Sequence, residues 1–217
     1  MKVVNLGENN SVLNNFIAEI RDVRVQKDRM RFRTNMERVG AIFAYEISKS
    51  LSYSEKEVTT PLGVAKVPTS DTTLVLAAIL RAGLPLQEGF LNVFDHAESA
   101  FLATFRKSGK GDYFKVHADY CTCPSLEGKT LILADTMLAT GSSIEVGLQK
   151  LLNDGGQPAH IHLVCPIASR FAVDHLCQLY GDEYTLWVSA IDEELTSHSY
   201  IVPGLGDAGD LAFGGKL

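Results

Sequence analysis

The sequence predicts an α/β fold with a mostly parallel sheet and helices on both of its faces, together with N-terminal helices and a β-hairpin. Two observations support this prediction. Apolar or β-branched runs recur after residue 70 and alternate with segments that have helical spacing. The run LVLAAIL at 74–80 is continuously apolar, which is typical of a strand buried on both faces. Strands that alternate with helices favour a parallel sheet, because the connecting helices cover its faces.

The first 70 residues predict two helices and a hairpin. Residues 11–20 carry apolar side chains at helical spacing behind Ser11, whose hydroxyl suits a helix N-cap. A second helix is expected from about 28 to 50. Its periodic apolar positions are Phe32, Met36, Val39, Phe43 and Ile47. The run VTTPLGVAKV at 58–67 places a Pro-Leu-Gly turn between two β-prone runs, which predicts a hairpin.

The remaining chain alternates between strands and helices. Strands are expected at 73–80, 99–105, 130–135, 160–167 and 184–190, and 112–120 could pair with a neighbouring strand. Helices are expected at 83–94, 141–156 and 170–180. Ligands bind beyond the carboxyl ends of the strands in such sheets. The loops at 81, 106, 135 and from 191 onward are therefore expected to converge on one site.

Composition favours a single soluble domain. We expect 217 residues to form one domain, with helices and hairpin in 1–70, a binding core in 71–190 and a C-terminal binding segment in 191–217. The net charge of −6 argues against a nucleic-acid partner. The longest apolar run is too short to span a membrane, and the first ten residues lack the apolar core of a signal peptide. A cytoplasmic protein without a membrane partner is expected.

The four cysteines raise the question of a metal site. Cys121 and Cys123 lie in HADYCTC, close to His117. A lone C-x-C pair without a second pair at finger-like spacing is weak evidence for zinc. We expect reduced thiols that are buried or lie in loops.

The stretch PGLGDAG at 203–209 contains the spacing G-x-G-x-x-G of a dinucleotide-binding loop. That loop needs a following helix and an acidic residue about 20 positions later, but only DLAFGGKL follows Gly209. A dinucleotide site is therefore excluded. Two interpretations stay open: glycines whose backbone approaches another ligand closely, or a frayed chain end.

The strongest local signal is LILADTMLATGSSI at 131–144. An apolar strand ends at Asp135, and a loop of small and hydroxylated residues leads to a helix that is expected to start at 140–143. Free N–H groups and the helix dipole make such a start an anion site, and Asp135 can accept hydrogen bonds from sugar hydroxyls. The alternative is a plain strand-turn-helix connection that Ser142 caps. The GKT at 128–130 is no Walker loop, because Cys123 stands where that pattern needs glycine.

The run LILADTMLATGSS resembles the phosphoribosyl-diphosphate (PRPP) binding signature of type I phosphoribosyltransferases, and more narrowly that of the uracil phosphoribosyltransferase family. Further segments resemble that family in the same order: RFRTNMERVGAIFAYE, TTPLG, ILRAGLPLQEG, AIDEELTSHSYIVPG and YIVPGLGDAGD. The resemblance covers nearly the whole chain. It implies a type I phosphoribosyltransferase-like fold.

The resemblance implies roles for the matching residues. Ribose and 5′-phosphate of PRPP would be held by Asp135, Thr136, Met137, Leu138, Ala139, Thr140, Gly141, Ser142 and Ser143. Arg81 and Arg106 would contact the diphosphate, since a guanidinium stays charged and binds phosphate oxygens in pairs. Uracil would be read by groups around Tyr200, Ile201, Gly206 and Ala208, with Asp207 beside the reacting ribose.

The implied reaction transfers the phosphoribosyl group from PRPP to N1 of uracil, giving UMP and diphosphate in pyrimidine salvage. Mg²⁺ would be held mainly by PRPP and water, without a dedicated protein metal site. Arg81, Arg106 and Asp207 would act catalytically on an oxocarbenium-like transition state, the arginines through electrostatic stabilisation of the leaving diphosphate. A homodimer or higher homo-oligomer is expected from the resemblance.

The chain departs from the family pattern at several positions. Thr136 stands where the family usually has proline, and Ser142 where it often has glycine. After Arg106 the family has two acidic residues, whereas this chain has Lys107 and Ser108. The first two changes leave the expected helix start intact. The others replace two acidic residues and, with Lys110 and Lys115, make the segment after Arg106 more basic, so that it either helps to hold diphosphate or is a solvated loop.

Two other functions are compatible with the same resemblance. One is a weak or inactive paralogue that senses PRPP or uracil nucleotides. Control of RNA by such a paralogue is disfavoured, because the chain has a net charge of −6 and lacks a cluster of Lys and Arg. The other is a phosphoribosyltransferase for a different base, which the uracil-type segment at 200–210 disfavours.

Overall fold

The computed structural model describes the backbone of residues 1–108 and 114–216, and the side chains of these residues except 105–119. Within the described residues, a seven-stranded sheet has the order β1-β11-β9-β7-β4-β5-β6. Its strands are β1 (Lys2–Asn5), β11 (Tyr184–Val188), β9 (His160–Val164), β7 (Thr130–Ala134), β4 (Leu74–Leu80), β5 (Glu98–Ser108) and β6 (Phe114–Thr122). Neighbouring strands are parallel, except that β6 pairs antiparallel with β5. The predicted, mostly parallel sheet is confirmed.

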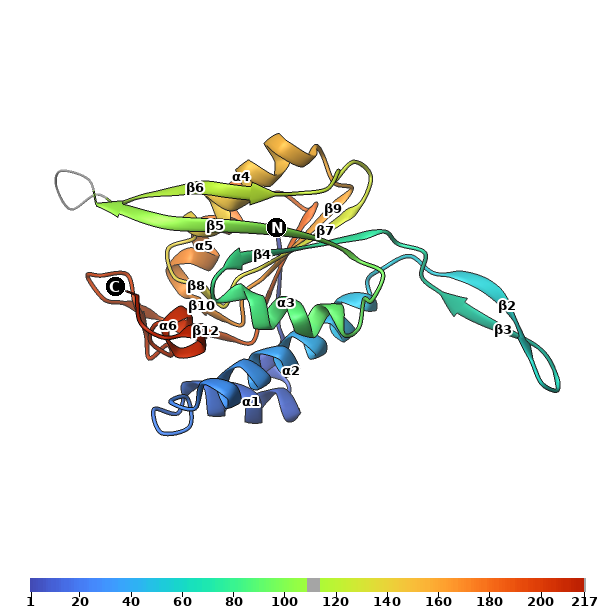
Figure 1. Ribbon diagram of the computed structural model, residues 1–217, viewed down its shortest axis with the longest axis horizontal. Coiled ribbons are helices and arrows are strands. Elements are labelled where there is room, and N and C mark those ends of the chain that lie inside the picture. Colours follow the sequence, from blue (N-terminus) through green and yellow to red (C-terminus); the bar gives the residue numbers. More distant parts are fainter. Residues whose placement is uncertain (109–113, 217) are drawn as a thin grey trace.

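Helices cover both faces of this sheet (Figure 1). On one face lie α1 (Val12–Arg21), α2 (Arg29–Ser48) and α3 (Gly83–Leu91), and on the other lie α4 (Ser142–Gly155) and α5 (Arg170–Leu179). Strand β4 contributes side chains to the apolar core on each face of the sheet, because its side chains alternate between the faces. Leu74 and Leu76 pack toward α2, whereas Val75 and Ala77 pack toward α4. The continuously apolar sequence of β4 follows from this double burial.

The two N-terminal helices begin where the sequence predicts. The Ser11 side chain accepts a hydrogen bond from Leu13 N at the start of α1, and Asp28 accepts one from Arg31 N at the start of α2. All five periodic positions predicted for the second helix are buried: Phe32, Met36, Val39, Phe43 and Ile47. Helix α2 is therefore fixed by its apolar stripe and its N-cap.

The predicted hairpin is present and extends further than 58–67. Strands β2 (Ser54–Thr60) and β3 (Gly63–Thr69) pair antiparallel, with Leu62 fully exposed in the turn between them. The hairpin projects away from the rest of the molecule (Figure 1). Almost all of its side chains are exposed, so its own burial contributes little to its stability.

Several short elements have no counterpart in the sequence prediction. Strands β8 (Met137–Leu138), β10 (Ile167–Ser169) and β12 (Ala190–Asp192) form a small parallel sheet beyond the carboxyl ends of β7, β9 and β11. Strands β13 (Glu194–Leu195) and β14 (Ile201–Val202) pair antiparallel, and η1 (Leu6–Glu8) and α6 (Ala208–Phe213) complete the chain. Runs this short carry no periodicity for a sequence to display.

Two further findings bear on the sequence predictions. Cys121, Cys123, Cys165 and Cys177 are free thiols, and burial raises the pKa of Cys121 to about 11, so it stays protonated. His117 has its side chain outside the described part of the chain. Within that part, no group of three or more His, Cys, Asp or Glu side chains could hold a metal, and no helix is long and apolar enough to cross a membrane.

Candidate active site

A cavity of about 700 Å³ lies at the carboxyl ends of β4 and β7. Three segments line it: 79–82 at the end of β4 and directly after it, 135–144 after β7 except Ser142, and residues of 199–209. Thr104 of β5 and Lys216 also contribute. The expected convergence of the loops at 81, 135 and beyond 191 is therefore confirmed. The prediction of a loop at 106 is wrong, because β5 continues to Ser108 and Arg106 pairs with Val116 of β6. The side chain of Arg106 lies outside the described residues.

The start of α4 opens into this cavity. Gly141 is the N-cap residue, with a φ of 90°, and has no side chain that could cap the helix. The one hydrogen bond from a described side chain is long: Thr140 Oγ1 accepts from Ser142 N–H at 3.5 Å. The interpretation of Ser142 as the cap is therefore wrong: its hydroxyl lies 3.1 Å from Thr140 Oγ1, and Ser142 does not line the cavity. Uncapped N–H groups and the positive end of the helix dipole make this helix start a site for an anion.

Asp135 lies at the carboxyl end of β7, at the edge of the same cavity. The backbone N–H of Thr136 donates to Asp135 Oδ1 at 2.7 Å. Burial raises the pKa of the Asp135 carboxyl to about 7, against the opposing effect of hydrogen bonds from the N–H groups of Thr136 and Met137. A carboxyl group that titrates near neutrality in a cavity is a candidate functional group.

Arg81 reaches the cavity from the end of β4, where the Leu80–Arg81 peptide bond is cis. Its Nη2 atom lies 3.0 Å from Asp210 Oδ1 of α6, and the two side chains are 37% and 41% exposed. An ion pair this open to solvent contributes little to stability. The guanidinium is therefore available to a charged ligand at modest cost.

The glycine-rich C-terminal segment is folded into the protein. Leu205 and Ala208 are 4% and 1% exposed and pack into the core beside α1 and α2, so the interpretation as a frayed end is wrong. Asp207 caps α6 by accepting a hydrogen bond from Asp210 N at 2.9 Å. Gly206 has a φ of 92°, and apart from its two chain neighbours no described residue has an atom within 4 Å of the position that a Cβ would take. A planar ligand can approach the backbone closely at this point.

The cavity brings together most of the predicted site residues. Its lining includes Arg81, Asp135, Thr136, Met137, Leu138, Ala139, Thr140, Gly141, Ser143, Tyr200, Ile201, Asp207 and Ala208. Ser142 and Gly206 are adjacent in sequence to lining residues without lining the cavity themselves.

Other lining residues were not predicted, among them Thr104, Ser199, Gly209 and Lys216. Ser199 is the only non-glycine residue with a positive φ in the described chain, at 61°. Serine occurs in any loop, so the sequence offers no signal for this conformation. Side chains held in this region cost energy and often lie at functional sites.

The parallel sheet, the strand that ends at Asp135 and the helix start that opens into the cavity are the features expected of a type I phosphoribosyltransferase fold. Within this class, the sequence model of the family "Uracil phosphoribosyltransferase" matches residues 8–215. The chain belongs to the uracil phosphoribosyltransferase family.

Individual relatives agree with this assignment. The uracil phosphoribosyltransferase of Porphyromonas gingivalis is 51% identical over 217 residues, which cover 100% of both chains. That of Methanothermobacter thermautotrophicus is 42% identical over 189 residues, covering 86% of this chain and 85% of the relative. Among solved structures, the AQ2163 protein from Aquifex aeolicus superposes with a TM-score of 0.86 at 30% identity, covering 98% of each chain. The predicted fold and family are thereby confirmed.

Proposed function

We propose that this chain transfers the phosphoribosyl group of PRPP to N1 of uracil, giving UMP and diphosphate in pyrimidine salvage. The observation that carries the proposal is the convergence of the 135–144 loop and the 199–209 segment on one cavity. The first segment suits a sugar phosphate and the second suits a planar base. The full-length similarity to uracil phosphoribosyltransferases supports this pairing of substrates.

The 5′-phosphate of PRPP would lie at the start of α4, where Thr140, Gly141 and Ser143 line the cavity. Backbone N–H groups there point at the ligand, and the helix dipole favours its negative charge. Asp135 would accept hydrogen bonds from the ribose hydroxyls. The polar groups of the loop would thus suit both parts of ribose 5-phosphate.

The diphosphate would be bound by Arg81 and by Arg106, whose role is inferred from the resemblance alone. A guanidinium forms paired hydrogen bonds with phosphate oxygens and keeps its charge. Binding would exchange the Asp210 carboxylate for diphosphate on Arg81. This exchange is favoured because diphosphate carries more negative charge than one carboxylate.

Uracil would be recognised by main-chain groups around Ile201, Gly206 and Ala208, with Tyr200 at the rim of the cavity. The edge of a pyrimidine presents donors and acceptors in one plane, and a backbone without side chains can meet them closely. Tyr200 is 47% exposed. Asp207 would lie beside the reacting ribose, at the junction between the base segment and α6.

The carboxylates of the cavity fit a role for Mg²⁺. This ion is usually held by one or two carboxylates together with substrate phosphates and water. Asp135 and Asp207 line the cavity, and among the described residues neither belongs to a group of three or more side chains that could hold a metal ion. When bound, Mg²⁺ neutralises part of the diphosphate charge. Arg81 and Arg106 would stabilise the charge that grows on the leaving diphosphate, and no protein nucleophile is needed.

We also propose that the protein acts in the cytoplasm as a homodimer or higher homo-oligomer. The projecting β2–β3 hairpin supports the proposed oligomer, because an isolated two-stranded hairpin is marginally stable in water. A second subunit would cover it.

A radiolabelled-uracil assay with PRPP and Mg²⁺ tests the reaction, with cytosine, hypoxanthine and xanthine as competing bases. We expect labelled UMP from uracil and no nucleotide from the other three bases. Product from another base would reject the assignment of the base site. Absence of any product, combined with calorimetric binding of PRPP or UMP, would instead indicate a sensor.

A further inference from the structure

A chain of hydrogen bonds links α1 to the C-terminal segment to which we assign uracil. Arg21 donates from Nη1 to Asp192 Oδ2 at 3.0 Å and from Nη2 to Asp192 Oδ1 at 3.1 Å. The backbone N–H of Gly204 donates to Asp192 Oδ2 at 2.9 Å. One carboxylate at the end of β12 therefore joins a helix near the N-terminus to the backbone that begins the glycine-rich segment.

The Arg21–Asp192 pair lies below the surface. The side chain of Asp192 is 9% exposed and that of Arg21 is 20% exposed. A buried carboxylate requires both a counter-charge and hydrogen bonds, and Asp192 receives them from the guanidinium and from Gly204 N–H. The paired geometry fixes the orientation of the carboxylate as well as its charge. Arg21 thereby determines where the Gly204 peptide is held.

Gln26, in the turn after α1, holds the neighbouring carbonyl. Its Nε2 atom donates to Leu205 O at 3.2 Å and to Ile20 O at 2.9 Å. The hydrogen bond to Ile20 O holds the Gln26 amide at the end of α1. The amide is therefore fixed in place where it donates to Leu205 O. The N–H of Gly204 and the C=O of Leu205 are thus both held by the segment around α1. In Figure 1 the C-terminal helix α6 lies beside α2, and Arg33 of α2 donates to Ala212 O of α6.

The glycine-rich segment needs such external support. Gly204 and Gly206 have φ values of 54° and 92°, and glycine adopts many other conformations nearly as readily. Recognition by main-chain groups requires N–H and C=O groups at fixed positions. Because the glycines have no side chains to fix these positions, neighbouring side chains must do so.

We propose that Arg21, acting through Asp192, and Gln26 are positioning residues for uracil recognition. They hold the backbone at 204–205, so that the main-chain groups of Gly206 and Ala208 face the base. The inference rests on the proposed function and names the side chains that set its specificity. None of the three is among the described residues that line the cavity, so each would act through the backbone at 204–205.

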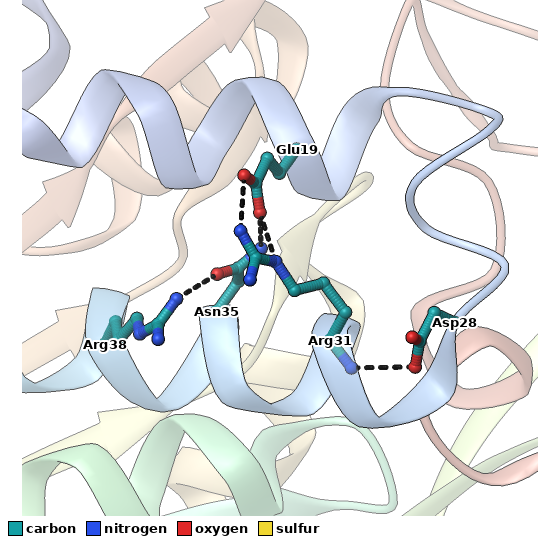
Figure 2. Close-up of polar contacts among 5 residues, drawn as sticks. All are labelled: Glu19, Asp28, Arg31, Asn35 and Arg38. Carbon is teal, nitrogen blue, oxygen red and sulfur yellow. Dashed lines mark hydrogen bonds and ion pairs between the residues drawn. The ribbon is translucent and has the colours of Figure 1, made fainter.

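Another arginine of the same helix pair provides a matched control. Arg31 of α2 donates from Nε and Nη2 to the two carboxylate oxygens of Glu19 on α1, each at 2.7 Å (Figure 2). Figure 2 also shows Asn35 donating to Glu19, while Arg38 donates to Asn35. These hydrogen bonds, led by those from Arg31, lower the pKa of Glu19 to about 2. The contacts of Arg31 within the described chain are with Glu19 and Asp28, away from 201–208.

The test compares the Michaelis constants for the two substrates in four variants. Arg21→Lys keeps the charge but loses the paired geometry, Asp192→Asn keeps an acceptor for Gly204 N–H, and Gln26→Ala removes the bond to Leu205. Arg31→Lys is the control. For the first three we expect the KM for uracil to rise about ten-fold, because each loses one or more partly buried hydrogen bonds, while the KM for PRPP changes less than two-fold. Arg31→Lys should change neither constant.

The outcomes separate positioning from general stability. Equal increases for both substrates, or no increase, in Arg21→Lys and Gln26→Ala would overturn the inference. Thermal unfolding identifies any variant that does not fold. If the variants of the ion pair do not fold, Gln26→Ala tests the inference without them, since it removes only uncharged hydrogen bonds at a half-buried position. Failure of the parent protein to form UMP would overturn both the proposed function and this inference.

Discussion

Asp135 shows how a single residue can serve a site at the expense of stability. Burial raises its pKa to about 7, whereas the pKa of an aspartate in an unfolded chain is about 4. Between these values the folded protein binds a proton that the unfolded chain has released. The stabilisation from this difference is fully present below about pH 4 and is lost as the pH rises through about 7. The ionised form, which accepts hydrogen bonds best, is therefore the costly one.

The substitution Asp135→Asn should remove this pH dependence. At pH 8 the variant should be more stable than the parent by up to about 4 kcal/mol, and the difference should shrink toward pH 5. Asparagine keeps an oxygen that can accept from Thr136 N–H, so the local fold should persist. Urea unfolding at pH 5 and pH 8 measures this effect. A difference that is equal at both pH values would contradict it.

Asp207 combines a structural role with the proposed catalytic one. Its side chain caps α6 by accepting from Asp210 N, and asparagine caps helices about as well as aspartate. Asp207→Asn should therefore leave thermal unfolding nearly unchanged while strongly lowering kcat. Asp28→Asn is the control, because Asp28 caps α2 in the same way and does not line the cavity. Unchanged turnover in Asp207→Asn would mean that the catalytic assignment is wrong.

Among the elements, the start of α4 combines helix geometry with ligand binding. Gly141 takes a φ of 90° there, which lets the chain turn from the β7 loop into the helix. A Cβ at Gly141 would lie 3.3 Å from Leu176 Cδ2, so there is little room to adjust. The geometry of the proposed phosphate site thus depends on one glycine.

Gly141→Ala should raise the KM for PRPP more than the KM for uracil. The left-handed conformation also costs alanine about 1–2 kcal/mol of stability. Gly128→Ala provides a control with similar strain, since Gly128 has a φ of 70° and does not line the cavity. Steady-state kinetics and thermal unfolding of both variants separate the two effects. A PRPP effect of equal size in Gly128→Ala would show that strain alone explains the kinetics.

At the scale of the whole molecule, the β2–β3 hairpin carries its apolar side chains mainly on one face. The register pairs Val58 with Ala65 and Val67 with Lys56, which places both valines on the same face. Each of the two valines is 40% exposed. Val64 lies on the opposite face, beside Glu57 and Lys66. If a second subunit covers the hairpin, the face with Val58 and Val67 is the expected contact.

The proposed homo-oligomer can be tested through this face. The parent protein should sediment as a dimer or larger assembly. The double variant Val58→Glu, Val67→Glu should shift it toward the monomer, because an interface would bury two like charges that repel each other and are costly to remove from water. Val64→Glu should have a smaller effect. Analytical ultracentrifugation measures all three. A monomeric parent would reject the proposal.

The long elements could be predicted because their signals are local. Helix α2 follows from its N-cap and its apolar period, and β4 follows from its continuously apolar run. Strand β1 was missed because it exists only through pairing with β11, which lies at the far end of the sequence. The predicted loop at 135–143 rests on a similarly local pattern, a strand followed by small polar residues and a helix.

The α/β class, the family, the long helices and strands, and most segments that line the cavity follow from the sequence alone. Each of these depends on periodicity or on a contiguous motif. Tertiary contacts alone reveal that Ser199 and Lys216 line the cavity, and that Arg21 reaches Asp192, 171 residues away. Such contacts arise when packed elements bring distant residues together, and no local pattern records them. The support of the glycine-rich segment by α1 is therefore visible only in the folded chain.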